Sequence, residues 1–72
     1  MTQEVVIADM QGRDLAAERV RARVLQQDVA AEMRVSRTVL SFVENEHVPL
    51  TADVARDYLA AIERCKAKRG EA

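Results

Sequence analysis

The chain has 72 residues, a net charge of −1 and 49% hydrophobic residues, with one cysteine, two glycines and one proline. This length allows one small domain, which needs compact helix packing or a partner to be stable. The composition, with few β-branched clusters beyond the N-terminus, favours an all-α fold over a sheet. A single cysteine excludes an intrachain disulfide, and with no cluster of Cys and His we expect no metal site and no cofactor.

The first residues carry no sign of export or of a membrane anchor. No apolar run approaches the roughly 20 residues that span a bilayer, and the start lacks the basic segment of a secretory signal. We therefore expect a cytoplasmic protein with no membrane partner. Residues 1–11 include the β-like patch Val5-Val6-Ile7, which predicts either a short strand or an N-terminal arm on the helices. A disordered start is the alternative.

Residues 12–65 are predicted to form the folded domain. From Gly12 to Val24 the apolar spacing is helical, and we expect Leu15, Val20 and Val24 to face inward. In the second part of the domain, residues 26–45 have the pattern of two short helices joined by a tight turn. Their inward residues are expected to be Val29, Ala30 and Met33 in the first helix and Leu40 and Val43 in the second.

Ser36 stands just before the second of these short helices. Its hydroxyl can accept from the unpaired N–H groups at a helix start, so this helix is expected to begin at about Arg37. Ser36 is also a candidate for a phosphate contact. Gln26 opens the preceding helix, where backbone N–H groups favour an anion, and is therefore a candidate to hydrogen-bond a phosphate.

The outward positions of the second short helix are expected to be Arg37, Thr38, Ser41 and Phe42. Arg37 has the fork that binds O6 and N7 of guanine. For Thr38 and Ser41, base contact, phosphate contact and simple exposure remain open. Phe42 is predicted either to touch a thymine methyl group or to cover the core edge or a dimer contact.

Pro49 ends any continuation of this helix, and Thr51 is a plausible cap for a last helix from about Ala52 to Cys65 or slightly beyond. The last helix is the expected dimerisation element, with the candidate interface residues Tyr58, Leu59 and Ile62. Residues 66–72 are predicted to form a basic, mobile tail.

Charge is distributed unevenly along the chain. Residues 13–42 carry six arginines and four carboxylates, residues 43–63 one arginine and five carboxylates, and residues 64–72 four basic side chains and one carboxylate. The basic character around the two short helices suits a nucleic acid despite the negative total. Arg21, Arg23 and Arg34 are candidates for contacts with the phosphate backbone, and simple exposure is the alternative for each.

Residues 26–45 resemble the helix-turn-helix of the lambda-repressor-like family, the Cro/CI and XRE-type regulators of phages and bacteria. Gln26 stands where the family has a Gln at the start of its second helix. Val29-Ala30 resembles the family's Leu-Ala, and Val43-Glu44-Asn45 resembles its Ile-Glu-Asn ending. The resemblance covers most of the chain. It implies a compact four- to five-helix lambda-repressor-like bundle with a helix-turn-helix.

The resemblance also implies a structural ion pair. Arg19, seven residues before Gln26, resembles the Arg of the family's first helix, whose partner is the Glu at the end of the third helix. In this chain that partner is Glu44.

Three positions where the family often has glycine carry side chains here: Arg23, Arg34 and Glu46. Glycine is favoured where a helix ends with a positive φ, and a side chain at such a position costs about 1 kcal/mol. We therefore expect a strained or differently shaped turn at Arg34. Leu25 stands where a Ser, Thr or Asn cap is usual, so the helix from Gln26 is expected to start without a side-chain acceptor.

These features predict a sequence-specific DNA-binding transcriptional regulator, a Cro-like or controller-type repressor. It is expected to act as a homodimer on a two-fold operator in double-stranded DNA, through the major groove. The alternative is a helix-turn-helix module that binds a protein, such as an antitoxin or an adaptor. The chain has no phosphate-binding loop and no catalytic constellation, so we expect neither an enzyme nor a small-molecule ligand.

Overall fold

The computed structural model describes residues 10–70, which form four α-helices and no strand. The helices are α2 (Gly12–Arg21), α3 (Gln26–Met33), α4 (Arg37–Glu44) and α5 (Ala52–Lys68). The predicted all-α class is confirmed for this part of the chain. The strand or arm predicted at residues 5–7 lies outside the described residues. No helix between residues 10 and 70 is long and apolar enough to cross a bilayer.

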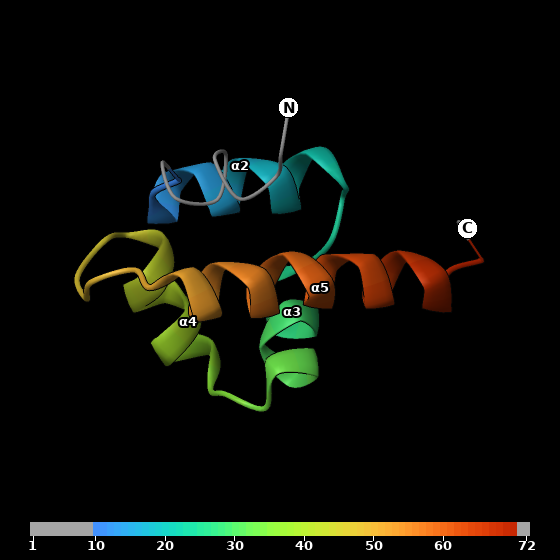
Figure 1. Cartoon of the computed structure of the whole chain (residues 1–72). Coiled ribbons are helices and arrows are strands. Elements are labelled where there is room, and N and C mark those ends of the chain that lie inside the picture. The colour runs from blue at the N-terminus through green and yellow to red at the C-terminus, as the bar shows by residue number, and fades with distance from the viewer. Residues whose placement is uncertain (1–9, 71–72) are drawn as a thin grey trace.

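The four helices pack in pairs around the longest one, α5, and around α4. Helix α5 packs against α2 and α3, while α4 packs against the same two helices. In Figure 1, α5 crosses the molecule with α2 above it and with α3 and α4 below it. Each helix contributes one large side chain that is completely buried: Leu15, Val29, Leu40 and Tyr58. One shared core therefore fixes the positions of the two short helices α3 and α4.

The helices begin where the sequence predicts. The Ser36 hydroxyl accepts a hydrogen bond from the Val39 N–H at 3.1 Å, and the Thr51 hydroxyl accepts one from the Val54 N–H at 3.1 Å. These bonds satisfy N–H groups that have no partner within the helix. Helix α3 begins after Leu25 without any side-chain cap, as predicted.

Three helices end in the same way, and none of them uses glycine. Arg23, Arg34 and Glu46 follow α2, α3 and α4 with φ values of 60°, 60° and 63°. At the end of α3, the Val35 N–H donates to the Ala30 carbonyl at 3.0 Å, and the Arg34 N–H donates to the Ala31 carbonyl at 3.2 Å. This pair of bonds is the Schellman motif, which places the residue after the helix at a positive φ and therefore favours glycine there. The strain predicted at Arg34 is thus present at three helix ends.

Gly12 lies where two backbones approach closely. A Cβ atom at this position would lie 1.9 Å from the carbonyl oxygen of Val43, near the end of α4. No side chain fits at that distance, so the first turn of α2 rests directly on the last turn of α4. This contact helps to fix the position of α4 on the core.

Two sequence predictions about the helices are wrong in detail. Val20 was predicted to face inward, but 63% of its surface is exposed. At 100° per residue, Val20 lies about 140° around the helix from the buried Leu15, whereas Arg19 lies only about 40° from it. Helix α2 also ends at Arg21 rather than Val24, although Val24 is buried as predicted.

The first residues of the predicted tail, 66–68, belong to the last helix, which the sequence allowed to extend slightly beyond Cys65. Helix α5 continues past Cys65 to Lys68, and Lys68 donates to the carboxylate of Glu32 on α3. The guanidinium of Arg69 donates to the carbonyl oxygens of Arg23 at 2.7 Å and Ala22 at 2.8 Å. These bonds attach the C-terminal end of α5 to α3 and to the end of α2.

Candidate nucleic-acid interface

Helix α4 has one face in the core and the opposite face in solvent. Leu40, Val43 and Glu44 are buried, and they lie within one arc of the helix. Thr38 and Phe42 lie about 160° around the helix from Leu40 and are exposed. Arg37, the first residue of the helix, is also exposed, and Ser41, about 100° from Leu40, is half-buried. The structure therefore places on the surface the four residues that the sequence predicts as base contacts.

Glu44 is the one charged residue in the core of the described chain, and it receives hydrogen bonds from three other helices. The Arg19 guanidinium on α2 donates through Nε to Oε2 at 2.8 Å and through Nη2 to Oε1 at 3.2 Å. Gln26 at the start of α3 donates from Nε2 to Oε1 at 3.1 Å. The Tyr58 hydroxyl on α5 donates to Oε2. We call these four side chains the Glu44 cluster.

The charges in the Glu44 cluster compensate one another. Burial alone would raise the pKa of Glu44, but the hydrogen bonds from Arg19 and Tyr58 outweigh it and hold that pKa below its ordinary value. Burial and the neighbouring carboxylate raise the pKa of Tyr58, so its hydroxyl stays protonated and acts as a donor. The buried carboxylate is therefore ionised and fully hydrogen-bonded at neutral pH. The predicted pair of Arg19 and Glu44 is present, and its geometry is bidentate.

Gln26 is half-buried, and its amide belongs to the Glu44 cluster. An amide group carries two N–H donors, of which Glu44 uses one. Sequence reasoning treated Gln26 as a surface residue and missed its bond to Glu44. The structure thus holds this side chain at the first turn of α3 and leaves a second amide hydrogen.

Two residues of the outward face of α4 were missed by sequence reasoning. Val39 is 46% exposed. Asn45 follows the helix, and its amide donates to the carbonyl oxygen of Ser41 at 2.9 Å and to the Ser41 hydroxyl at 3.1 Å. The rotation of 100° per residue would have placed both residues on this side. The bond from Asn45 also shows that Ser41 is already partly hydrogen-bonded.

Phe42 is partly exposed, with 47% of its surface in solvent. Its ring meets the imidazole of His47 edge to face, with 5.7 Å between the ring centroids and 77° between the planes. This contact orients the aromatic ring from the segment that follows α4. The ring therefore stands on the outward side of α4.

The basic residues fall into two groups. Arg13, Arg19, Arg21, Arg56, Arg64, Lys66 and Lys68 each lie within 4.0 Å of a carboxylate. Arg69 donates to backbone carbonyl oxygens. Within residues 10–70, the side chains of Arg23, Arg34 and Arg37 have neither an ion pair nor a hydrogen bond. These three arginines are among those predicted to contact DNA, and they follow α2, follow α3 and begin α4. Arg21, also predicted to contact a phosphate, is paired with Glu18 instead.

Two of the three predicted dimer-interface residues belong to the core instead. Tyr58 is completely buried and Ile62 is 4% exposed. Both lie on the side of α5 that packs against α2 and α3. Neither side chain is therefore accessible to a second copy of the chain. Leu59 is partly exposed. The hydroxyl of Tyr58 lies inside the protein and donates to Glu44.

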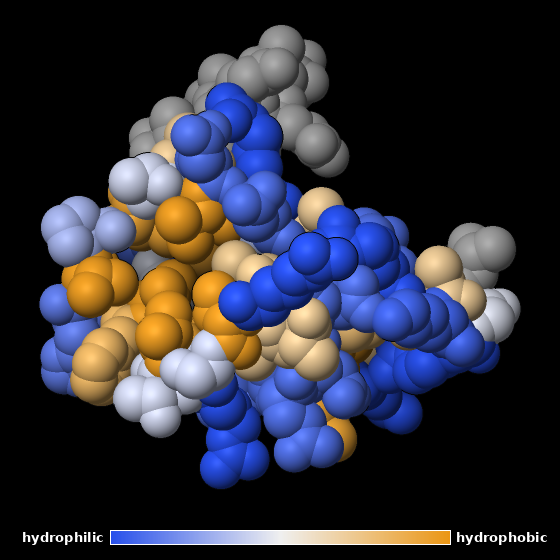
Figure 2. Space-filling model, turned by 90° about the horizontal axis from the view of Figure 1, so that it is seen from below, coloured by the Kyte–Doolittle hydropathy of each residue, from blue (hydrophilic) through white to orange (hydrophobic). Residues whose placement is uncertain are grey.

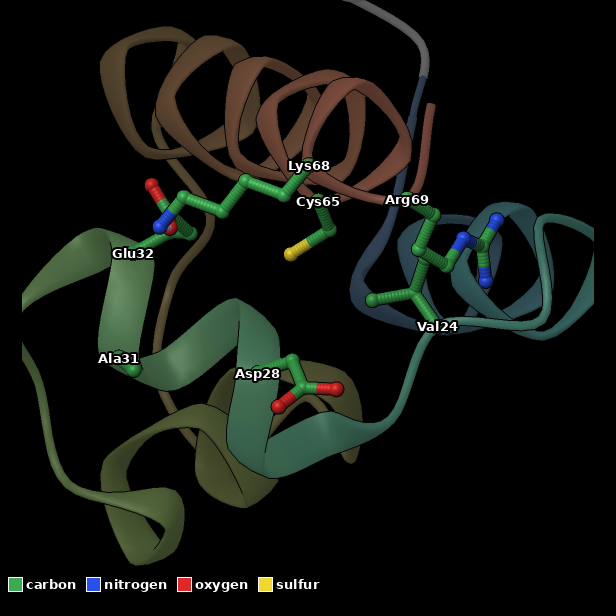
Figure 3. A pocket seen from close by; sticks show the side chains of 7 residues that line it. All are labelled: Val24, Asp28, Ala31, Glu32, Cys65, Lys68 and Arg69. Carbon is green, nitrogen blue, oxygen red and sulfur yellow. Dashed lines mark hydrogen bonds and ion pairs between the residues drawn. The ribbon is translucent and has the colours of Figure 1, made fainter. Parts of the chain in front are cut away.

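A cavity of about 310 Å³ lies between α3 and the end of α5 (Figure 3). The Cys65 sulfur points into it, and Asp28, Glu32, Lys68 and Arg69 stand around it. Burial raises the pKa of the Cys65 thiol, which keeps it neutral and unreactive. Among the described residues no group of three or more His, Cys, Asp or Glu side chains could hold a metal ion. The sequence had no signal for this cavity, because its walls come from distant segments.

No family model, no curated protein and no solved structure matches the chain.

Proposed function

We propose that the chain is a sequence-specific DNA-binding regulator with a lambda-repressor-like helix-turn-helix formed by α3 and α4. In this proposal α4 enters the major groove, and Arg37, Thr38, Ser41 and Phe42 face the base edges. Gln26 and Ser36 contact phosphates from the starts of α3 and α4. A homodimer on a two-fold operator completes the proposal, with each subunit reading one half-site.

The observation that carries this proposal is the position of the three arginines without partners. Other cations of the described chain are neutralised by carboxylates or bound to carbonyl groups, so they add little to the attraction for a polyanion. Arg23, Arg34 and Arg37 instead remain available around α3 and α4. Charged side chains left in water at such positions suit phosphate oxygens and guanine. The negative net charge therefore does not argue against DNA as the partner.

A second candidate function is supported by the exposed apolar residues. Val39, Phe42 and Val48 are each exposed by more than 40%. Exposed apolar groups of this kind also occur at protein-binding surfaces. A helix-turn-helix module that binds another protein is therefore the alternative, such as an antitoxin or an adaptor.

Selection from a pool of random duplexes, read by sequencing, tests the proposal. We expect enrichment of an inverted repeat whose half-sites lie about one helical turn apart. Failure to enrich any sequence would contradict sequence-specific DNA binding and favour the protein-binding alternative. The salt dependence of binding to the enriched duplex then counts the phosphate contacts, since each contributes about 0.9 to the slope of log K against log salt.

A matched pair of variants connects the test to the arginines. Arg34→Ala removes an unpaired arginine, whereas Arg56→Ala removes an exposed arginine paired with Asp53 on α5. We expect the slope to fall by about one contact for Arg34→Ala and to stay unchanged for Arg56→Ala. Equal slopes for the two variants would show that the unpaired arginines do not contact phosphates.

A further inference from the structure

Three exposed apolar side chains occur at one end of the molecule. Val39 is 46% exposed, Phe42 is 47% exposed and Val48 is 41% exposed. Figure 2 shows apolar side chains gathered over the end where α4 and the segment after it lie, while hydrophilic side chains dominate the end near the C-terminus. Val39 and Phe42 are three residues apart on α4 and therefore neighbours on its surface.

The core of the protein does not require these side chains. Leu40 and Val43 already fill the inner face of α4, with 0% and 8% of their surfaces exposed. Neither Val39 nor Phe42 contributes to that buried face. An apolar pair kept in water on a helix of eight residues points to a partner with apolar groups.

The charges around the pair define that partner further. Arg37 begins the same helix and Arg34 precedes it, and both lack a carboxylate among the described residues. The acidic side chain of α4 is Glu44, which is turned into the core. Unpaired positive charge thus stands before and at the start of α4, about 140–160° around the helix from the apolar pair in the case of Arg37, and no exposed position of α4 carries a carboxylate. A matching partner presents apolar groups next to negative charge.

The major groove of DNA has this combination. The 5-methyl group of thymine projects into the groove, and phosphates line both of its edges. We infer that Val39 and Phe42 recognise pyrimidine 5-methyl groups, so that the target carries thymine at the positions they face. This inference rests on the proposed DNA binding and adds Val39 to the specificity-determining residues. It also means that 5-methylcytosine binds better than cytosine at those positions, because it carries the same methyl group.

The test removes single methyl groups from the DNA. In the enriched duplex each thymine is replaced in turn by deoxyuridine, which keeps every hydrogen-bonding group and lacks only the methyl. We expect affinity to fall about fourfold at each thymine whose methyl is buried against the protein, and to stay unchanged elsewhere. Replacing cytosine by 5-methylcytosine in a duplex with cytosine at such a position should restore a similar factor.

Variants then assign the methyl groups to side chains. Val39→Thr keeps the shape of the side chain and exchanges a methyl for a hydroxyl, and Phe42→Ala removes the ring. In each variant, replacing the thymine that faces the substituted side chain by deoxyuridine should no longer lower the affinity. Replacement of the other contacted thymines should still lower it. Val20→Thr is the matched control, because Val20 is an exposed valine on α2. Circular dichroism checks that each variant is folded.

The outcomes separate this inference from the proposed function. A duplex that binds tightly with no sensitivity to any single thymine methyl would overturn the inference and leave DNA binding intact. The same conclusion follows if Val39→Thr and Phe42→Ala keep every deoxyuridine penalty, as Val20→Thr does. If no duplex is enriched at all, the proposed function fails and the inference fails with it. In that case the apolar pair serves a protein partner.

Discussion

The arginines on the two faces of α4 have opposite surroundings. On the inner face, Arg19 is held by two hydrogen bonds to a carboxylate that also binds Gln26 and Tyr58. On the outer side, Arg37 and Arg34 have no partner within the described residues. The inner charge contributes to the fold, and the outer charges are available to a ligand. A substitution should therefore change stability on one face and binding on the other.

The largest effect is expected on the inner face, from Glu44→Ala. This change leaves the partly buried Arg19 guanidinium without its carboxylate partner, and breaking a buried pair costs about 3–5 kcal/mol. Urea denaturation should show this loss in the free energy of unfolding. Glu63→Ala is the control, because it removes an exposed ion pair with Lys66 and should cost no more than about 1 kcal/mol. Similar losses in the free energy of unfolding for the two variants would show that the Glu44 cluster stabilises the fold no more than an exposed ion pair does.

Arg37→Ala tests the outer face. We expect a loss of about 1–3 kcal/mol in binding to the enriched duplex, much less for random duplex, and an unchanged melting temperature. Competition binding with labelled duplexes measures both affinities. An equal loss of affinity on all sequences would show that Arg37 contacts a phosphate rather than a base. A lower melting temperature would show that this outer residue also contributes to the stability of the fold.

Arg34→Gly is expected to act on stability and binding in opposite directions. A left-handed residue with a side chain costs about 1–2 kcal/mol, from which the greater backbone freedom of glycine in the unfolded chain subtracts about 0.5–1 kcal/mol. The variant should therefore be more stable by about 0.5–1 kcal/mol, as thermal unfolding can show. Its salt slope on DNA should fall by about one contact. A lower melting temperature for Arg34→Gly would show that the left-handed conformation of Arg34 does not destabilise the protein.

The smallest expected effect is the response of the inner face to acid. The pKa of Glu44 is lowered in the folded state, so its contribution to stability is present above the ordinary glutamate pKa of about 4.3. That contribution is lost as the pH falls through the lower folded value. Melting curves from pH 6 to pH 3 should fall less steeply for Glu44→Gln than for the original chain. Parallel curves would show that Glu44 does not carry this dependence.

Local signals in the sequence were sufficient for much of the fold. The starts of α3, α4 and α5 and the caps at Ser36 and Thr51 were predicted correctly, because each depends on a few neighbouring residues. The sequence left open how far α5 extends beyond Cys65, since its last turn is stabilised by Glu32, which lies more than 30 residues earlier. Such contacts between distant segments have no local pattern.

The candidate site was predictable in part for the same reason. The outward position of Thr38 and Phe42 follows from the helical repeat, which places both about 160° around α4 from Leu40. Arg37 lies only about 60° from Leu40 and is exposed at the first residue of the helix. The Glu44 cluster was foreseen only as an ion pair, through a family resemblance, because the bonds from Gln26 and Tyr58 depend on how three helices meet. Which arginines lack partners could not be predicted either. Pairing depends on side chains that approach each other only in the folded chain.

The three left-handed residues that end α2, α3 and α4 have a consequence for the lifetime of the protein. Measured against glycine at the same positions, they together cost about 1.5–3 kcal/mol, against a total stability of about 5–15 kcal/mol for a typical domain. Every 1.4 kcal/mol is a factor of ten, so this strain raises the unfolded fraction about ten- to a hundredfold. Proteases degrade a chain mainly while it is open. We therefore expect three helix ends, rather than the core, to set how quickly a cell clears this protein.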